Sequence, residues 1–357
     1  MYDLEPGDGS TPAMHLRFRS IDEAEPGAKW KAHLEEAWPA YHRWFLREGE
    51  SKRPSYLRSS RMLAQYMPEL VPLWERLTAL GGGGDHVARL LSLYRPTPYL
   101  AGCSQAVWSR PDGAEPLLVR NYDYHPALCE GTLLLTAWHG TKVIAMSDCL
   151  WGVLDGLNEH GLAVSLAFGG RPDVGEGFGV PLVLRYVLEF SRTTEDAVRV
   201  LQRVPSHMAY NVSVLDASGA HATVEVGPEH AAVVSHDRVA TNHQRHGLWP
   251  AHAVRTATEE RKQVLEQRLD DAGETRAGFI DGFLEAPLFG TDYAHALGTL
   301  YTATYAPAGR WMELRWRDHA WRRSFAAFEE EELLVAYGPD GSSPVPGPAA
   351  SSTAALG

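Results

Sequence analysis

The sequence has little cysteine and no long apolar run. Its three cysteines among 357 residues cannot build a disulfide framework, and none stands in a C-x-x-C metal spacing. No stretch approaches the roughly 18 apolar residues that a membrane span needs. The first residues also lack the basic start and apolar core of a secretory signal. We therefore expect a cytoplasmic protein in a reducing compartment, with no membrane partner.

Positive charge is scarce as well. The 33 Lys and Arg residues face 45 Asp and Glu residues, which gives a net charge of −12. A nucleic-acid binder needs a basic face to meet phosphates, so a nucleic-acid partner is not expected. The hydrophobic share of 44% and the charged share of 22% are those of an ordinary folded protein with a continuous core.

Three zones follow one another along the chain. Up to about residue 100, apolar residues recur at helical spacing, and Pro39 is expected to kink or split the first helix. From Cys103, short apolar runs with turns at "NEHG" and "DASG" predict strands. The order strands, two helices, strands, two helices, strands predicts an α+β fold of sheets layered with helices. The Pro- and Ser-rich tail, residues 339–357, is expected to be disordered. The helices are predicted at about 30–45, 63–77, 86–94, 180–190, from Thr194, at 256–270 and at 275–284.

Five short motifs stand in order along the middle of the chain. "GCS" contains Cys103, and "RNYD" begins seventeen residues later. "DGLNEHGLAV" at 155–164, "YNVSVLDASG" at 210–219 and "ATNH" at 240–243 follow. A lone cysteine is more often an inert packing residue, and that interpretation applies to Cys129 and Cys149. The ordered set of motifs instead marks Cys103 as a candidate functional residue.

The set resembles the N-terminal-nucleophile hydrolases of the choloylglycine hydrolase and isopenicillin-N acyltransferase type, also described as the C45 peptidase group. The resemblance covers about residues 95–320 and implies a four-layered αββα sandwich. It also implies autoproteolytic scission between Gly102 and Cys103. Residues 1–102 would then be a helical pro-segment or small subunit, and residues 103–338 the catalytic domain. The two fragments are expected to stay associated.

Several site residues follow from this resemblance. Cys103 would be the nucleophile, and its freed α-amine, with a pKa of about 7.7–8.0 against about 8.5 for a thiol, would be the base. Gly102 is expected to allow a strained backbone that a Cβ would block. Arg120 matches the family arginine that favours thiolate, and Asp123 the aspartate that orients the α-amine. Asn211 matches the asparagine whose amide donates to the oxyanion.

The resemblance also suggests a second arginine and several pocket residues. Arg261, in "TATEERKQVL", matches a second active-site arginine, although charged helices usually form solvated faces. Tyr122, Asn242 and His243 are candidates for the pocket lining. The chain departs from bile-salt hydrolases at Ala167, near which those enzymes carry another functional asparagine. That departure weakens a bile-salt assignment.

The resemblance implies an amidohydrolase acting on linear non-peptide amides, or an N-acyltransferase, that works through a thioester acyl-enzyme without cofactor or metal. Its substrate would be a small-molecule amide or acyl thioester, and water or an amine would take the acyl group. Three alternatives stay open. The chain could be an uncleaved binding or scaffold protein, or a Cys–His protease with an internal Cys103. It could also be a metal-dependent amidohydrolase that uses His243 and His246.

Overall fold

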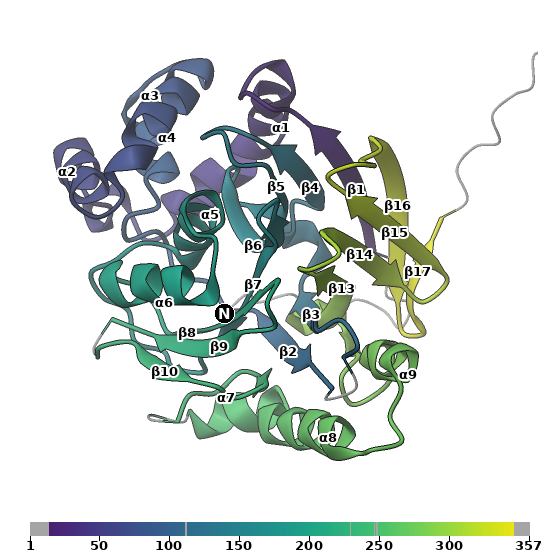
Figure 1. The fold of residues 1–357 in the computed structure, drawn as a ribbon. Helices are drawn as coiled ribbons and strands as arrows, with labels where there is room; N and C mark the ends of the chain where they lie inside the picture. Colours follow the sequence, from purple (N-terminus) through teal and green to yellow (C-terminus); the bar gives the residue numbers. More distant parts are fainter. Residues whose placement is uncertain (1–13, 111–112, 229, 246, 248, 346–357) are drawn as a thin grey trace, which may run out of the picture.

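Two β-sheets pack face to face at the centre of the protein, and helices cover both outer faces (Figure 1). This arrangement confirms the α+β class and the four-layered αββα sandwich. No helix in the described part of the chain has the length and apolar character to cross a membrane. The computed structural model describes residues 14–110, 113–228, 230–245, 247 and 249–345.

The larger sheet has ten strands within the described residues. Its strands from 132 to 235 form an antiparallel meander, as the short apolar runs predicted. Gly161 and Gly219 take φ values of +83° and +87° in the predicted turns, a region that glycine occupies without steric cost. The strands are, in spatial order, β10 (Val233–Ser235), β9 (His221–Val226), β8 (Tyr210–Asp216), β7 (Leu162–Phe168), β6 (Gly152–Asn158), β5 (Val143–Asp148), β4 (Thr132–Thr136), β1 (Met14–Asp22), β16 (Glu331–Gly338) and β17 (Gly341–Pro344).

Strand β1 places the N-terminal part of the chain inside this larger sheet. It pairs in parallel with β4 and antiparallel with β16, so it has a neighbouring strand on both edges. Only helices were predicted in this region, although Met14, Leu16 and Phe18 alternate with polar residues, which is the two-residue period of a strand. The tail prediction is also corrected in part: β17 forms within it, and residues 346–357 lie outside the described residues.

The smaller sheet contains the predicted scission point. Strand β2 begins at Gly102, and its register with β3 sets Cys103 opposite Tyr122 and Gly102 opposite Asp123. Because side chains alternate along a strand, Cys103 and Tyr122 face the larger sheet, while Asp123 faces the helical layer. The strands are, in order, β11 (Val239–Ala240), β2 (Gly102–Trp108), β3 (Leu117–Tyr124), β13 (Leu297–Ala306), β14 (Trp311–Trp316) and β15 (His319–Ser324), with β12 (Thr291–Asp292) beside β13.

Helices complete the outer layers. Figure 1 shows α5 and α6 over the larger sheet, α7 to α9 beside the smaller sheet, and α1 to α4 grouped near α5. Thr193 and Asp196 form a capping box that starts α6. Of the two predicted effects of Pro39, a kink or a split, the split does not occur, because Pro39 lies inside the continuous helix α1. The helices are α1 (Ala28–Phe45), α2 (Tyr56–Tyr66), α3 (Val71–Leu80), α4 (Asp85–Leu91), α5 (Val180–Phe190), α6 (Thr194–Arg203), α7 (Pro250–Arg255), α8 (Thr258–Asp270) and α9 (Arg276–Asp281).

Gly156 on β6 shows how closely α5 lies on the larger sheet. A Cβ there would lie 2.6 Å from the Ala145 Cβ and 2.9 Å from Leu188 Cδ1 of α5. We expect Gly156→Ala to lower the free energy of unfolding by about 1–3 kcal/mol, the usual cost of overpacking, as measured by urea denaturation. Gly338→Ala is the matched control, because a Cβ at Gly338 meets nothing within 4 Å. Equal losses at the two positions would contradict this account of the packing.

Candidate active site

The side chain of Cys103 lies in the interface between the two sheets. Cys103 is 0% exposed, and its Sγ accepts a hydrogen bond from Arg120 Nη2 at 3.0 Å. Burial raises the pKa of this thiol to about 11, although the positive charge of Arg120 acts in the opposite direction. In the uncut chain the thiol is therefore protonated at neutral pH and shielded from solvent.

Arg120 is held in place by Asp155 of the larger sheet. The Arg120 Nη1 and Asp155 Oδ2 atoms are 2.5 Å apart, and both side chains are fully buried. The Tyr301 hydroxyl donates to Asp155 Oδ2 at 2.7 Å, and the Tyr305 hydroxyl donates to Oδ1. The guanidinium also lies 4.9 Å from the centre of the Tyr122 ring. Burial disfavours the charge on Arg120, but Asp155 together with Cys103, Tyr301 and Tyr122 outweighs it and keeps the pKa of Arg120 above its ordinary value.

Arg261 of α8 approaches β2 from the opposite face. Its guanidinium donates to Asp123 Oδ2 at 3.0 Å and to Ser104 Oγ at 2.9 Å. It also donates to Asn242 Oδ1 at 2.7 Å. Thr299 Oγ1 donates to the other oxygen of Asp123 at 2.7 Å. Burial raises the pKa of Asp123 and lowers that of Arg261, while their mutual attraction opposes both shifts.

Asn242 contacts the backbone on both sides of the predicted scission point. The backbone N–H of Cys103 donates to Asn242 Oδ1 at 2.9 Å. The Asn242 Nδ2 donates to the carbonyl oxygens of Phe168 at 3.1 Å and Ala101 at 3.4 Å. Asn242 was expected to line the pocket, and the structure places it directly at the Cys103 nitrogen.

Asn211 has a different arrangement from the one expected of an oxyanion donor. Its Nδ2 donates to the carbonyl oxygens of Thr241 and His243, each at 2.8 Å. Both amide hydrogens are therefore engaged in this structure. Because those two carbonyls flank Asn242, the Asn211 side chain orients the loop that presents Asn242 to Cys103.

Gly102 is required for space and not for unusual backbone geometry. The structure corrects the expectation of a strained conformation, because Gly102 does not have a positive φ. A Cβ at Gly102 would lie 2.9 Å from the Asp123 Cβ and 3.2 Å from Asp123 Oδ2. Any larger residue would therefore push the Asp123 carboxylate away from Arg261.

Comparison with known proteins assigns the family. A family model described as acyl-coenzyme A:6-aminopenicillanic acid acyl-transferase matches residues 108–321. The chain belongs to this family. Membership makes it an enzyme of the N-acyltransferase and amidohydrolase type. No curated protein sequence matches the chain.

Several solved structures are similar to this member of the acyl-transferase family. Penicillin V acylase from Agrobacterium tumefaciens has a TM-score of 0.45 and 16% identity, over 65% of this chain and 90% of that one. A Caenorhabditis elegans orthologue of N-acylethanolamine-hydrolyzing acid amidase has a TM-score of 0.43 and 18% identity, over 58% and 93%. A mutant of conjugated bile acid hydrolase from Clostridium perfringens has a TM-score of 0.39 and 13% identity, over 64% and 96%. Such distant likenesses say nothing about the substrate of this acyl-transferase family member.

Three residues that complete the site of this acyl-transferase family member, Ser104, Asp155 and Thr299, were not predicted from the sequence. Ser104 lies inside the motif "GCS" and Asp155 inside "DGLNEHG". Their position within these motifs is the signal that could have identified them. Thr299 lies on β13, and its bond to Asp123 spans 176 residues of chain. Nothing in the local sequence around Thr299 indicates that contact.

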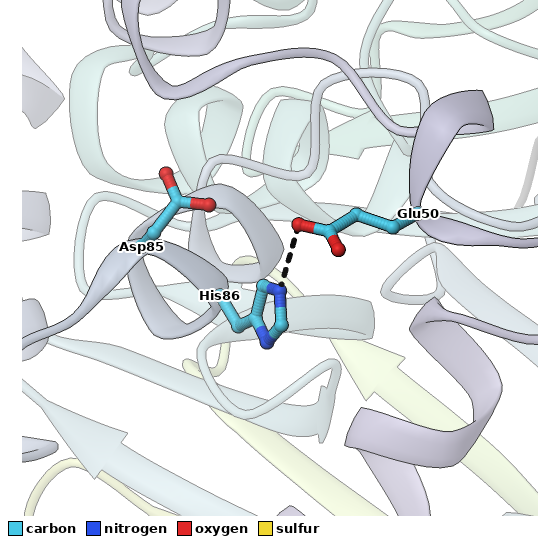
Figure 2. A group of neighbouring side chains, drawn as sticks. All are labelled: Glu50, Asp85 and His86. Atoms are coloured by element: carbon cyan, nitrogen blue, oxygen red, sulfur yellow. Dashed lines mark hydrogen bonds and ion pairs between the residues drawn. The ribbon is translucent and has the colours of Figure 1, made fainter.

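The structure also bears on metal binding in this acyl-transferase family member. Among the described residues, one group of potential ligands gathers, namely Glu50, Asp85 and His86, with donor atoms within 4.8 Å of one another (Figure 2). Arg89 Nη1 lies 2.5 Å from the Asp85 carboxylate and 3.2 Å from that of Glu50, so both carboxylates already pair with the same guanidinium. The group belongs to the N-terminal helices and lies away from β2 (Figure 1).

The one described histidine of the metal alternative, His243, has threonine hydroxyls as its side-chain hydrogen-bond partners. The His243 Nδ1 lies 2.9 Å from Thr258 Oγ1, and burial lowers the pKa of its ring. His246 lies outside the described residues. His243 thus fills a structural position beside α8, while its carbonyl is held by Asn211.

The buried ion pair between Arg120 and Asp155 leads to a stability prediction. In a Cys103→Ala background, Asp155→Asn should lower the free energy of unfolding by about 3–5 kcal/mol, because it leaves a buried guanidinium without its counter-charge. Urea denaturation measures the loss. The double change Arg120→Met with Asp155→Asn removes both charges, keeps an amide oxygen as acceptor for a tyrosine hydroxyl, and should recover part of the loss. If the losses of unfolding free energy in the two single variants simply add up in the double variant, the two charges are not coupled.

Proposed function

We propose that this chain is an autoproteolytically activated cysteine amidohydrolase or acyltransferase, with Cys103 as its nucleophile. The supporting observation is the set of contacts around one residue. The Cys103 thiol faces Arg120, and the Cys103 nitrogen is bonded to Asn242, which shares Arg261 with Asp123. The site therefore holds both groups that an N-terminal nucleophile needs, its sulfur and its nitrogen.

In the activation step, the Cys103 sulfur attacks the carbonyl carbon of Gly102. The Gly102–Cys103 C–N bond breaks, the nitrogen gains a proton, and the acyl group moves to sulfur as a thioester. Water then hydrolyses the thioester and leaves a carboxylate on Gly102 and a free α-amine on Cys103. The domain boundaries of this proposal are residues 1–102 for the small fragment and 103–338 for the catalytic one.

In the catalytic step, the α-amine of Cys103 removes the thiol proton and later gives it to the leaving amine. A free α-amine has a pKa of about 7.7–8.0, which suits this exchange at neutral pH. Asp123 lies next to the new amine and orients it, while the cationic Arg120 favours the thiolate. A linear non-peptide amide or an acyl thioester gives the thioester acyl-enzyme, and water or an amine completes the reaction. The family description, with an acyl-coenzyme A and an amine, supports this substrate class.

The two fragments are proposed to stay together after scission. Strand β1 of the small fragment is hydrogen-bonded between β4 and β16, which both belong to the catalytic fragment. The N-terminal helices add buried contacts, such as the Trp30 Nε1 bond to the Leu150 carbonyl at 2.9 Å. Removal of such a strand would expose two unpaired edges within the sheet.

Intact-mass spectrometry under denaturing conditions tests the activation step. Wild type should give two fragments that meet at Gly102 and Cys103, and Cys103→Ala should remain whole, because no sulfur is present to attack. Under native conditions the wild-type fragments should elute together with the mass of the uncut chain. An uncut wild type would refute this function and favour the binding-protein alternative.

The buried thiol also predicts how the scission rate depends on pH. Its pKa of about 11 in the uncut chain lies above the usual value, so the reactive thiolate becomes more abundant as the pH rises toward 11. Between pH 6 and 9 the rate should rise by up to about tenfold per pH unit. Freshly synthesised precursor, sampled over time on denaturing gels, gives the rate, with Cys103→Ala as the uncut control. A rate that falls with pH would contradict thiolate attack.

A further inference from the structure

The chain just before the predicted scission point packs a tyrosine against a row of aromatic rings that ends opposite the nucleophile. The Tyr99 ring lies 6.1 Å from the Trp44 ring and 6.3 Å from the Tyr124 ring, measured between centroids. The Tyr99 hydroxyl donates to Asp148 Oδ2 at 3.0 Å. Tyr124 in turn lies 5.7 Å from Tyr122, the residue opposite the nucleophile in the strand register. A row of aromatic rings therefore leads from the nucleophile to Tyr99.

The carboxylate below Tyr99 is buried and depends on that hydroxyl. Asp148 is 7% exposed, and its Oδ1 receives a long bond from the Tyr41 hydroxyl at 3.4 Å. Without Tyr99, the carboxylate would keep the backbone N–H of Cys149 and the Cys149 thiol, which is a weak donor 3.7 Å from Oδ2. A buried acceptor without a good donor is costly, so this position calls for a hydroxyl or another donor.

The neighbouring carboxylate does not share this need. Glu130 accepts bonds from Ser147 Oγ at 2.8 Å and the Leu150 N–H at 2.7 Å, and from the Tyr41 hydroxyl. His33 Nε2 lies 2.8 Å from Glu130 Oε2. Glu130 is therefore satisfied without the segment that precedes Cys103. Of the two buried acids, Asp148 alone depends on Tyr99.

The segment that holds Tyr99 has to make way for a substrate. Residues 96–101 form no helix or strand, and Leu100 is 41% exposed. The acyl carbon of a substrate must take the place of the Gly102 carbonyl carbon next to Sγ. The rest of the acyl group then follows the path that the residues before Gly102 occupy in the uncut chain.

We propose that the site of the Tyr99 side chain becomes the acyl-group subsite of the processed enzyme, and that Asp148 selects aromatic acyl groups carrying a para hydroxyl. The proposal rests on the function proposed above and names its acyl group. Tyr122 and Tyr124 form the walls, and Asp148 receives the hydroxyl at the far end. The precursor thus displays, in its own Tyr99, the group that the mature site recognises.

The test uses the processed enzyme and a matched series of p-nitroanilides. Phenylacetyl, 3-phenylpropanoyl and 4-phenylbutanoyl donors are each made with a para hydrogen, hydroxyl or methoxy group. Burial and the charge of Glu130 raise the pKa of Asp148 to about 7, so turnover is measured at pH 8.5, where Asp148 is a carboxylate. At the chain length that fits, kcat/KM for the hydroxyl compound should exceed that for the other two by about 10- to 100-fold, since the hydroxyl donates to a buried carboxylate and methoxy cannot. This comparison of donors uses only the wild-type enzyme, so it does not depend on whether any variant folds.

Variants assign the preference to Asp148. Asp148→Asn removes the charge at constant size and should reduce the hydroxyl preference, measured as the ratio of kcat/KM for the hydroxyl and unsubstituted donors, to a few-fold. Glu130→Gln removes the neighbouring charge that raises the pKa of Asp148, so it leaves Asp148 in place as a carboxylate and should keep the hydroxyl preference.

Failure of the subsite is distinguishable from failure of the function. An uncut Gly102–Cys103 bond refutes the proposed function and the subsite with it. A processed enzyme with no preference at any chain length, in turnover or in calorimetric binding of the free acids, refutes the subsite alone.

Discussion

The ion pair between Arg120 and Asp155 joins the two sheets at the point where the Cys103 side chain lies. Both groups are completely buried, so each charge is stable there only because the other is present. The pair keeps a cation 3.0 Å from Cys103 Sγ in an interior that otherwise raises the pKa of the thiol. Sheet packing and the electrostatics of the site therefore depend on the same contact.

The alternation of side chains along β2 divides the site into two halves. The thiol lies on the inner face with Arg120, whereas Ser104 meets Arg261 on the face toward α8. Asp123, which Arg261 also contacts, lies on that outer face, and the Cys103 nitrogen bonds to Asn242. One arginine thus acts on the sulfur, and the other organises the groups around the nitrogen.

The N-terminal part of the chain has two opposing roles. Strand β1 is hydrogen-bonded on both edges within the larger sheet, so the fold needs it in place. The irregular residues 96–101 lead directly into Gly102 and Cys103, and the proposed acyl-group subsite requires them to move. The two roles are compatible because they belong to segments that differ in hydrogen bonding: a paired strand resists displacement, and an irregular segment yields.

The sequence by itself determined the layered α+β class and the turns at Gly161 and Gly219, because these depend on local patterns, namely apolar runs and glycines that take positive φ. The grouping of Cys103 with Arg120 and Asp123 followed from the resemblance of the ordered motifs to a known family, and the structure brings them together because β2 and β3 pair as neighbours. Only the tertiary structure decided that β1 enters the sheet, that Asn242 meets the Cys103 nitrogen while Asn211 orients its loop, and that Asp155 balances Arg120. Each of these depends on which groups remain free after segments distant in sequence have packed together, and a linear pattern does not contain that information.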